Sequence, residues 1–463
     1  MCRIERISKK TETYAQTLLC PKTVGPRGSA RRHAENCNVF KDSVRACRQG
    51  SNQGSESDNM ALWLSLTCHR RKRYTNTCLQ LFVLTAVTFG IVLPLMCHDL
   101  LHSYYFIRSW HLDHMSWKFL DKNLEEAQAA VQYFDNLHLS NSPLMASANA
   151  DEPSSKPWLV ITVVTVQRRL EYHYPLQVMS RFHRLLTRCG NACRHHRLFI
   201  CNVDQNPQSH QDALVLAKFF PTVVRYGEKK ETPPEGVDSI NLFEKEKRDY
   251  VYCLAKVLST FDTEYVLMLE DDAVPEDEIF SILHHLLLAR FTESPLGGAL
   301  YFKLFHPERL QHYVNPEPMR ILEWIGLGMF LSTLLSLAYT WAIGYRGSSW
   351  PIFLFFMLYS MALVELFGRH YLLELRRLTP ALYNVVPVTE CCTPAMLYSA
   401  ASAHRTLEYL SELQCRPGFA KDTALYSILS EKEEWAFVVE PNLVRHVGLH
   451  SSLRGINNSP KLL

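Results

Sequence analysis

The stretch 265–275 reads YVLMLEDDAVP, a short apolar run that ends in three consecutive acids, Glu270, Asp271 and Asp272. Such a run is typical of a strand buried on both faces, as in a parallel sheet. Neighbouring carboxylates are costly to bury, because desolvation and mutual repulsion both oppose their charged forms. We therefore expect a buried strand that delivers acids to a polar site at its carboxyl end.

Strand-like and helix-like segments alternate around this stretch. The first strong strand is WLVITVVTV at 158–166, and further strands are expected at 197–203, 381–386, 436–439 and 443–449. Helical spacing of apolar residues predicts helices at 175–189, 243–261, 276–291 and 421–430. This order indicates an α/β fold with a mostly parallel sheet and helices on both faces, in which ligands bind at the carboxyl ends of strands.

Three apolar regions approach or reach the length of about 20 residues that crosses a bilayer. They are 79–97, 324–345 and 352–367. The basic cluster HRRKR at 69–73 favours a cytosolic N-terminus and a luminal chain beyond the first region; a cleaved signal peptide is the alternative. The other two regions predict a transmembrane hairpin with a cytosolic turn at 346–351. Because the region 352–367 is short and contains Glu365, a re-entrant hairpin that does not cross the membrane is the alternative.

The membrane regions divide the rest of the chain. The predicted segments are a disordered extension at 1–59, a cytosolic tail at 60–78, a luminal stem and linker at 98–157, and two catalytic parts at 158–323 and 368–463. Neither catalytic part alone resembles a complete α/β sheet, so we favour one domain interrupted by the hairpin over two domains. Arg369, Arg376 and Arg377 would then be luminal, against the positive-inside tendency.

Composition excludes some functions and favours disulfides. The net charge of +3 on 463 residues gives no overall field that would attract nucleic acid. Cysteines in luminal segments favour disulfides. We expect a local bridge between Cys189 and Cys193 rather than a metal ligand pair, because no second pair follows at zinc-site spacing. Cys201 and Cys253 are a second candidate pair, although sequence does not determine connectivity.

The three acids are hard oxygen ligands at a strand end. They suit Mg²⁺ or Mn²⁺, which bridge phosphate oxygens and neutralise the charge on a departing diphosphate. A structural alternative is an acidic turn in which Glu276 and Glu278 favour the N-terminus of a helix. The acids alone also leave open a metal-dependent membrane phosphotransferase or phosphohydrolase, and a non-catalytic membrane protein.

Longer motifs narrow this choice by resemblance. A strand that ends in EDD resembles the DXD motif of GT-A nucleotide-sugar glycosyltransferases, and KRDY at 247–250, LEDD at 269–272 and HVGLHSSL at 446–453 resemble motifs of the N-acetylglucosaminyltransferase IV group. The stretches FEKEKRDYVYCL, HPERLQHYVNPEPMRILEW, GRHYLLELRRL and ECCTPAM resemble the Golgi N-acetylgalactosamine transferases that modify GPI glycans. That resemblance covers most of residues 61–463.

The resemblance implies a GT-A domain split by a transmembrane hairpin, with its catalytic part in the Golgi lumen. Such an enzyme would use UDP-N-acetylgalactosamine and Mn²⁺ to add a β-linked sugar, with inversion, to the first mannose of the GPI core. Its acceptors would be the glycans of GPI-anchored proteins. The implied metal ligands are Asp272 and the late histidine His446, with His450 in reserve, although either histidine would also suit an ordinary strand.

Further roles follow from the same resemblance. Glu270 and Asp271 would orient the metal, the ribose or the sugar. The donor site would also include Val166 at the end of the first strand and the positions Cys392, Thr393 and Lys421. Thr393 would bond the sugar and Lys421 the diphosphate. Arg168 and Arg169 would reach phosphate or simply be solvated, and Cys392 would pair with Cys391 or elsewhere, for example with Cys415.

Inversion requires a carboxylate that takes the proton of the acceptor hydroxyl. Asp422 is our candidate for this base, and Glu390 and Glu412 are the alternatives. For each of these three carboxylates, the alternative is that it forms a surface salt bridge and takes no part in catalysis.

Overall fold

The computed structural model describes residues 76–139, 156–168, 170–226, 241–290, 296–307, 318–343, 350–390, 392–451 and 456–457. The chain forms two compact units, 1–92 and 93–463. The predicted extension at 1–59 and most of the predicted linker lie outside the described residues. Within the first unit, the described part is the beginning of an apolar helix.

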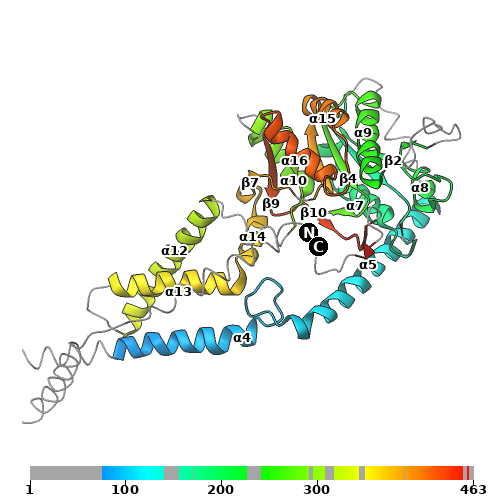
Figure 1. Cartoon of the computed structure of the whole chain (residues 1–463). Coiled ribbons are helices and arrows are strands. Elements are labelled where there is room, and N and C mark those ends of the chain that lie inside the picture. The colour runs from blue at the N-terminus through cyan, green and yellow to red at the C-terminus, as the bar shows by residue number, and fades with distance from the viewer. Residues whose placement is uncertain are drawn as a thin grey trace, which may run out of the picture. The chain divides into compact units, whose positions relative to one another are not determined.

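An eight-stranded sheet with the order β3-β2-β1-β4-β8-β6-β9-β7 is the centre of the second unit (Figure 1). Its parallel part comprises β3 (Thr222–Val224), β2 (His196–Asn202), β1 (Leu159–Thr165) and β4 (Tyr265–Glu270). The other part comprises β8 (Ala395–Ser399), β6 (Tyr301–Lys303), β9 (Ala436–Glu440) and β7 (Asn384–Pro387). Strand β8 is antiparallel to both neighbours, β6 is parallel to β9, and β7 is antiparallel to β9. The predicted α/β fold with a mostly parallel sheet is confirmed.

Helices cover both faces of this sheet because successive strand residues point to opposite sides. Val160 of β1 packs in a core cluster with residues of α9 (Leu242–Thr260), α15 (Ala400–Glu412) and α16 (Lys421–Glu431). The next residue, Ile161, packs in a second cluster with residues of α5 (Arg108–Leu139), α7 (Tyr174–Cys189) and α10 (Ile279–His285). Both faces of β1 are thus buried, as its continuous apolar sequence predicts.

Several elements depart from the sequence-based prediction. Strand β8 was not predicted, although it lies in the middle of the sheet. The predicted strand at 381–386 begins only at Asn384, because Pro380–Leu382 forms a 3-10 turn. The predicted helix at 276–291 is shorter, with α10 followed by a π-helical turn at Leu286–Arg290. Shorter elements are α4 (Leu93–Met96), α8 (Gln211–Leu216), α14 (His370–Glu374), β5 (Ala273–Pro275), β10 (Val444–His446), β11 (His450–Ser451) and β12 (Ile456–Asn457).

Three described helices are long and apolar enough to cross a membrane: Asn76–Met96, Arg320–Ile343 and Trp350–Gly368. The second lies within α12 (Pro318–Ile343), and the third is α13 (Trp350–Gly368). The third helix has 19 residues, more than the region expected from sequence. Strand β6 precedes these two helices and strands β7, β8 and β9 follow them, yet all four belong to one sheet.

The arginines around the paired helices are neutralised by nearby acids. Arg369 pairs with Glu365 at 2.8 Å, and Arg376 pairs with Glu323 at 2.6 Å. Arg377 likewise contacts Glu278 at 2.6 Å. At the start of α12, Arg320 pairs with Glu440, which is fully buried at the end of β9. Each of these arginines is therefore ion-paired within the protein.

Candidate functional site

A cavity of about 490 Å³ lies at the carboxyl ends of β1 and β4. Ligand sites of small molecules commonly have volumes of about 300–1,000 Å³. The first-choice residues that the sequence suggested for donor, metal and base are in its lining: Val166, Glu270, Asp271, Asp272, Cys392, Thr393, Lys421, Asp422 and His446. The topology explains this convergence, because the carboxyl ends of the parallel strands β1 and β4 share one edge of the sheet.

Asp271 and Asp272 are both buried, with side chains only 1% exposed, and they share one arginine. The Arg168 Nη2 atom lies 2.9 Å from Asp271 Oδ1, and Arg168 Nη1 lies 2.5 Å from Asp272 Oδ2. Asp271 Oδ2 also accepts hydrogen bonds from Thr165 Oγ1 at 3.0 Å and from the Val166 N–H at 3.2 Å. The guanidinium and the end of β1 therefore compensate the buried acids.

Asp272 and His446 form the centre of a group that can hold a metal. Glu270, Asp272 and His446 each offer a ligand atom, and these atoms lie within 4.8 Å of one another. His446 Nε2 is 3.4 Å from Asp272 Oδ2. Asp272 Oδ1 is buried and has no hydrogen-bond partner among the described residues. An orphaned carboxylate oxygen beside an imidazole and a second carboxylate fits a divalent ion such as Mn²⁺.

The environment shifts the pKa values of these groups in opposite directions. Burial raises the pKa of Asp271 to about 6, against the opposing effect of Arg168. Burial also acts to raise the pKa of Asp272, but Arg168 and His446 outweigh it and hold that pKa well below its ordinary value. The pKa of His446 is raised, because Asp272 outweighs the effect of burial. Asp272 is therefore held as a carboxylate more firmly than Asp271.

A short strand pair brings His446 to the acids. Strand β10 pairs antiparallel with β5, so His446 lies opposite Ala273, the residue after Asp272. The Val447 N–H donates to the Asp272 carbonyl at 2.9 Å. At Gly448, an added Cβ would lie only 1.8 Å from Asp272 Oδ2. The segment after β10 therefore both supplies the histidine and encloses the carboxylate.

Glu270, the outermost of the three acids, is 31% exposed and pairs with a buried lysine. Lys421 Nζ lies 3.2 Å from Glu270 Oε1 and 3.0 Å from Glu246 Oε1, and its ammonium lies over the Tyr250 ring. Burial acts to lower the pKa of Lys421, but the two glutamates outweigh it and raise that pKa. Lys421 therefore stays charged at the cavity wall, where an anionic ligand would meet it.

The candidate bases occupy different places. Asp422, at the start of α16, is part of the cavity lining and accepts a hydrogen bond from the Thr423 N–H at 2.9 Å. Glu390 is exposed and does not line the cavity. Glu412 does not line the cavity either, and it forms an ion pair with Lys432 at 3.0 Å on the protein surface. The side chain of the reserve ligand His450 lies outside the described residues.

The structure contradicts two of the alternatives that the sequence left open for cysteine and arginine residues near the cavity. Cys392 is disulfide-bonded and has a positive φ of 64°, whereas Cys415 is a free, buried thiol. The suggested pairing of Cys392 with Cys415 is therefore wrong. Arg168 is mostly buried and ion-paired, rather than solvated. Arg169 and Cys391 lie outside the described residues.

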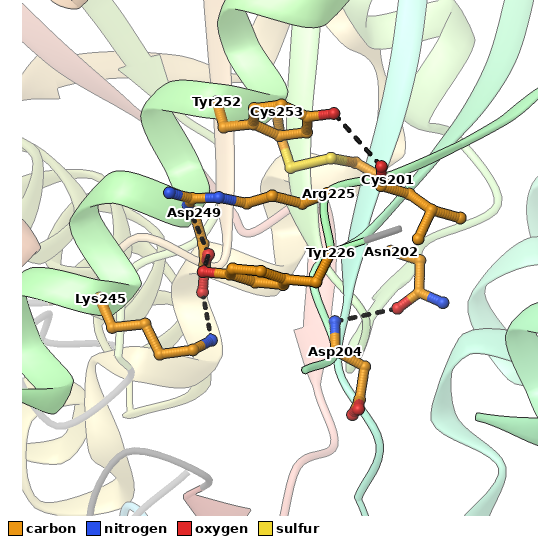
Figure 2. The surroundings of a disulfide bond; sticks show 10 residues. Cys201, Asn202, Asp204, Arg225, Tyr226, Lys245, Asp249, Tyr252 and Cys253 are labelled. Carbon is orange, nitrogen blue, oxygen red and sulfur yellow. Dashed lines mark hydrogen bonds and ion pairs between the residues drawn. A yellow bond between two sulfur atoms is a disulfide. The ribbon is translucent and has the colours of Figure 1, made fainter. Parts of the chain in front are cut away.

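A disulfide anchors α9, whose residues form part of the cavity wall. Figure 2 shows the surroundings of this disulfide. Cys201 of β2 is bonded to Cys253 of α9, and Asp249 lies one turn earlier on the same helix. Asp249 accepts from Tyr226 Oη at 2.9 Å and pairs with Lys245 at 2.7 Å. It also pairs with Arg225 at 2.5 Å. Asp249 and Lys245 line the cavity, so the disulfide holds a polar wall in place.

The two disulfides should differ in their effect on stability. The predicted bridge between Cys189 and Cys193 is also present, with a sequence separation of 4 against 52 for Cys201–Cys253. Loop entropy predicts a loss of about 4 kcal/mol for the double alanine variant of the long bridge and about 2 kcal/mol for the short one. Thermal unfolding of the two double variants measures the difference. Equal losses would contradict the loop argument.

Sequence reasoning missed Gly448 and Asp249 as parts of the site. Gly448 had a signal, because a glycine two residues after a candidate metal ligand often permits a close approach of backbone to a site. Asp249 falls in the quoted KRDY motif, but its three donors come from α9 and from the residues after β3. Only the packing of α9 against those residues identifies its role.

The arrangement of the cavity defines a class of protein. An acidic, cation-lined cavity at the carboxyl edge of a mixed α/β sheet suits an enzyme that binds an anionic small molecule, with or without a metal. A family model described as GPI-N-acetylgalactosamine transferase PGAP4 matches residues 159–445. The chain belongs to this family and is a glycosyltransferase of GPI-anchor modification.

Proposed function

We propose that this transferase uses UDP-N-acetylgalactosamine as donor and adds the sugar, in a β-linkage and with inversion, to the first mannose of the GPI core. The observation that carries the proposal is the group of Glu270, Asp272 and His446, with ligand atoms within 4.8 Å of one another in the cavity. The family supports the sugar and the acceptor class. The α/β sheet with acids at the end of β4 is consistent with a GT-A fold.

Asp272, His446 and Glu270 would hold Mn²⁺. A bound divalent ion neutralises charge that grows on the departing diphosphate. The cavity's own cations would assist, because Lys421 and Arg168 both line it. Thr393, which is 5% exposed, offers a hydroxyl from the segment before β8 that would bond the sugar. The backbone at Val166 would contact the nucleotide, and Asp271 would orient the end of β1 through its hydrogen bonds.

The transfer itself exchanges one bond at the anomeric carbon. The oxygen of the mannose hydroxyl forms a bond to C1 as the bond between C1 and the phosphate oxygen breaks. UDP leaves with that electron pair, and the hydroxyl proton passes to a carboxylate of the protein. Attack from the face opposite to the diphosphate inverts the configuration. Asp422 is the carboxylate that we assign to the proton, because it lines the cavity and forms no salt bridge among the described residues.

Replacement of Asp422 by Asn should abolish transfer and leave UDP binding largely intact. The amide cannot accept the proton, so kcat should fall by about 100-fold or more. The rate of sugar transfer and the Kd for UDP measure the two effects separately. Glu412→Gln is a matched control that removes a carboxylate from the surface pair with Lys432. Turnover retained by Asp422→Asn would remove Asp422 from this role.

Purified full-length protein in detergent, given GPI-bearing acceptor and single UDP-sugars, tests the whole proposal. We expect transfer from UDP-N-acetylgalactosamine in preference to UDP-N-acetylglucosamine, a β-linked product by mass analysis with linkage-specific hexosaminidases, and loss of activity on chelation. An α-linked product would exclude inversion. Activity that persists unchanged in chelator would exclude the metal. Release of phosphate from lipid-linked phosphates without sugar transfer would favour the phosphohydrolase alternative.

We also propose that the enzyme acts in the Golgi with its catalytic unit luminal. The three apolar helices support a multi-pass membrane protein. A GPI-anchored acceptor keeps its lipid in the bilayer, so a catalytic domain that contains a membrane hairpin would hold its cavity near the acceptor and raise the effective concentration. Protease protection in sealed Golgi vesicles measures the orientation. Digestion of the catalytic unit from the cytosolic side would contradict it.

A further inference from the structure

Arg168 occupies an unusual position in the acid cluster. Its side chain is only 13% exposed, and its two terminal nitrogens contact two different acids, Asp271 at 2.9 Å and Asp272 at 2.5 Å. The guanidinium carbon also lies 5.9 Å from the centre of the Tyr174 ring. Arg168 comes from the segment after β1, so these contacts join the ends of β1 and β4. The arginine therefore places a cation between the two buried carboxylates.

One oxygen of Asp272, Oδ2, lies close both to the cation Arg168 and to the candidate metal ligand His446. Asp272 Oδ2 contacts Arg168 Nη1 and lies 3.4 Å from His446 Nε2, and Asp272 belongs to the three-residue group that can hold a metal. A divalent ion next to this carboxylate would meet the positive charge of Arg168 at short range. Two cations that share one carboxylate repel each other, strongly so in a poorly solvated site.

The surrounding backbone leaves the Asp272 carboxylate little room to move away from Arg168 when a divalent ion is bound. A Cβ at Gly448 would lie 1.8 Å from Oδ2 and 2.7 Å from Cγ, so the Gly448 backbone closes directly over the carboxylate. The Val447 N–H holds the Asp272 backbone through its carbonyl at 2.9 Å. The Arg168 side chain is long and flexible by comparison. It is therefore the component that can move.

We propose that Arg168 is a tethered cation that competes with the divalent ion for Asp272. Before the ion binds, its guanidinium compensates Asp271 and Asp272 and keeps both carboxylates in place. When the ion binds, Arg168 gives up its contact with Asp272 and keeps its contact with Asp271. The inference rests on the proposed metal site. It adds a positioning residue that lowers the metal affinity of the free enzyme and stabilises the site when the metal is absent.

Metal binding by the full-length protein in detergent tests this inference without any measurement of activity. Mn²⁺ titrations followed by electron paramagnetic resonance, which detects free Mn²⁺, would compare wild type, Arg168→Gln and Arg168→Lys. Removal of the competing charge should tighten Mn²⁺ binding by about tenfold or more in Arg168→Gln. Lysine keeps the charge but lacks the planar guanidinium whose two terminal nitrogens contact the two acids separately, so Arg168→Lys should have an intermediate Kd and serves as the readout if Arg168→Gln fails to fold.

Thermal unfolding supplies a second readout. Without metal, Arg168→Gln should unfold at a lower temperature than wild type, and saturating Mn²⁺ should raise its midpoint by more than it raises that of wild type. Arg405→Gln is the matched control, because Arg405 pairs with Glu434 at 2.7 Å away from the cavity. That variant should keep the wild-type Mn²⁺ Kd.

The possible results are distinguishable. Tighter Mn²⁺ binding by Arg168→Gln, together with the unchanged control, would support the competition. A Kd within twofold of wild type, or weaker binding, in both Arg168 variants would overturn it while leaving the metal site intact. If wild type and variants all fail to bind Mn²⁺, or if Asp272→Asn binds it as well as wild type, the proposed metal site itself fails.

Discussion

The Asp272→Asn enzyme should fold and lose transferase activity by about 1,000-fold, which corresponds to about 4 kcal/mol of transition-state stabilisation. Asp272 is 1% exposed, contacts Arg168 and His446, and has a buried oxygen without a hydrogen-bond partner among the described residues. Asparagine has nearly the same shape but carries no charge, so it would weaken metal binding far more than packing. The rate of sugar transfer at saturating UDP-N-acetylgalactosamine is the direct measurement.

Two further measurements separate loss of chemistry from loss of structure. The thermal midpoint without metal should change little, because Arg168 retains Asp271 as a partner at 2.9 Å. Glu412→Gln provides the surface carboxylate control. Activity of Asp272→Asn within tenfold of wild type would show that the Asp272 carboxylate is not essential, and it would overturn the role that we give to the acids after β4.

Gly448→Ala is expected to reduce activity by about 100-fold, because misplacement of a catalytic group by about 1 Å can have that effect. The new Cβ would lie 1.8 Å from Asp272 Oδ2 and 3.1 Å from Arg168 Nη1. Those distances force the carboxylate to move away from its position. The backbone at Gly448 does not have the positive φ that disfavours alanine. The defect should therefore be confined to the Asp272 carboxylate and its partners.

Gly298→Ala is the matched control for this substitution. A Cβ at Gly298 would meet nothing within 4 Å, so this variant should keep wild-type activity and stability. Kinetic measurements on both variants, with Mn²⁺ titrations of Gly448→Ala, would test the steric argument. Full activity of Gly448→Ala would mean that the carboxylate can shift without consequence. A large loss in Gly298→Ala would mean that the effect is not specific to the site.

The parallel half of the fold was predictable because its signals are local. The apolar runs that become β1 and β4 are continuous and end abruptly, and the helices between them have clear apolar spacing. Strand β8 escaped prediction because AMLYS is short and immediately follows Pro394, and it has no alternation that separates it from a loop. Its position beside β4 depends on antiparallel pairing with residues far away in the sequence.

The acids and His446 were identified from motifs, but their partners were not. Arg168 was left open between a phosphate contact and a solvated side chain, and the structure gives it instead to Asp271 and Asp272. Glu412 was a reasonable carboxylate by sequence, and only the structure shows that its side chain is 56% exposed, outside the cavity and paired with Lys432. A motif specifies a chemical group, whereas the charge balance around that group depends on which other elements pack against it.

The sequence by itself determined the α/β class, the apolar helices, the acids at the end of β4 and the family motifs, because each depends only on residues that are close together in the chain. The tertiary structure alone decided how strands on both sides of the two apolar helices pair in one sheet, that β10 brings His446 to Asp272, and that Arg168 bridges the buried acids. These relations join distant segments. They arise because burial of the sheet brings strand ends together, and charged side chains buried there are stable only when they are paired.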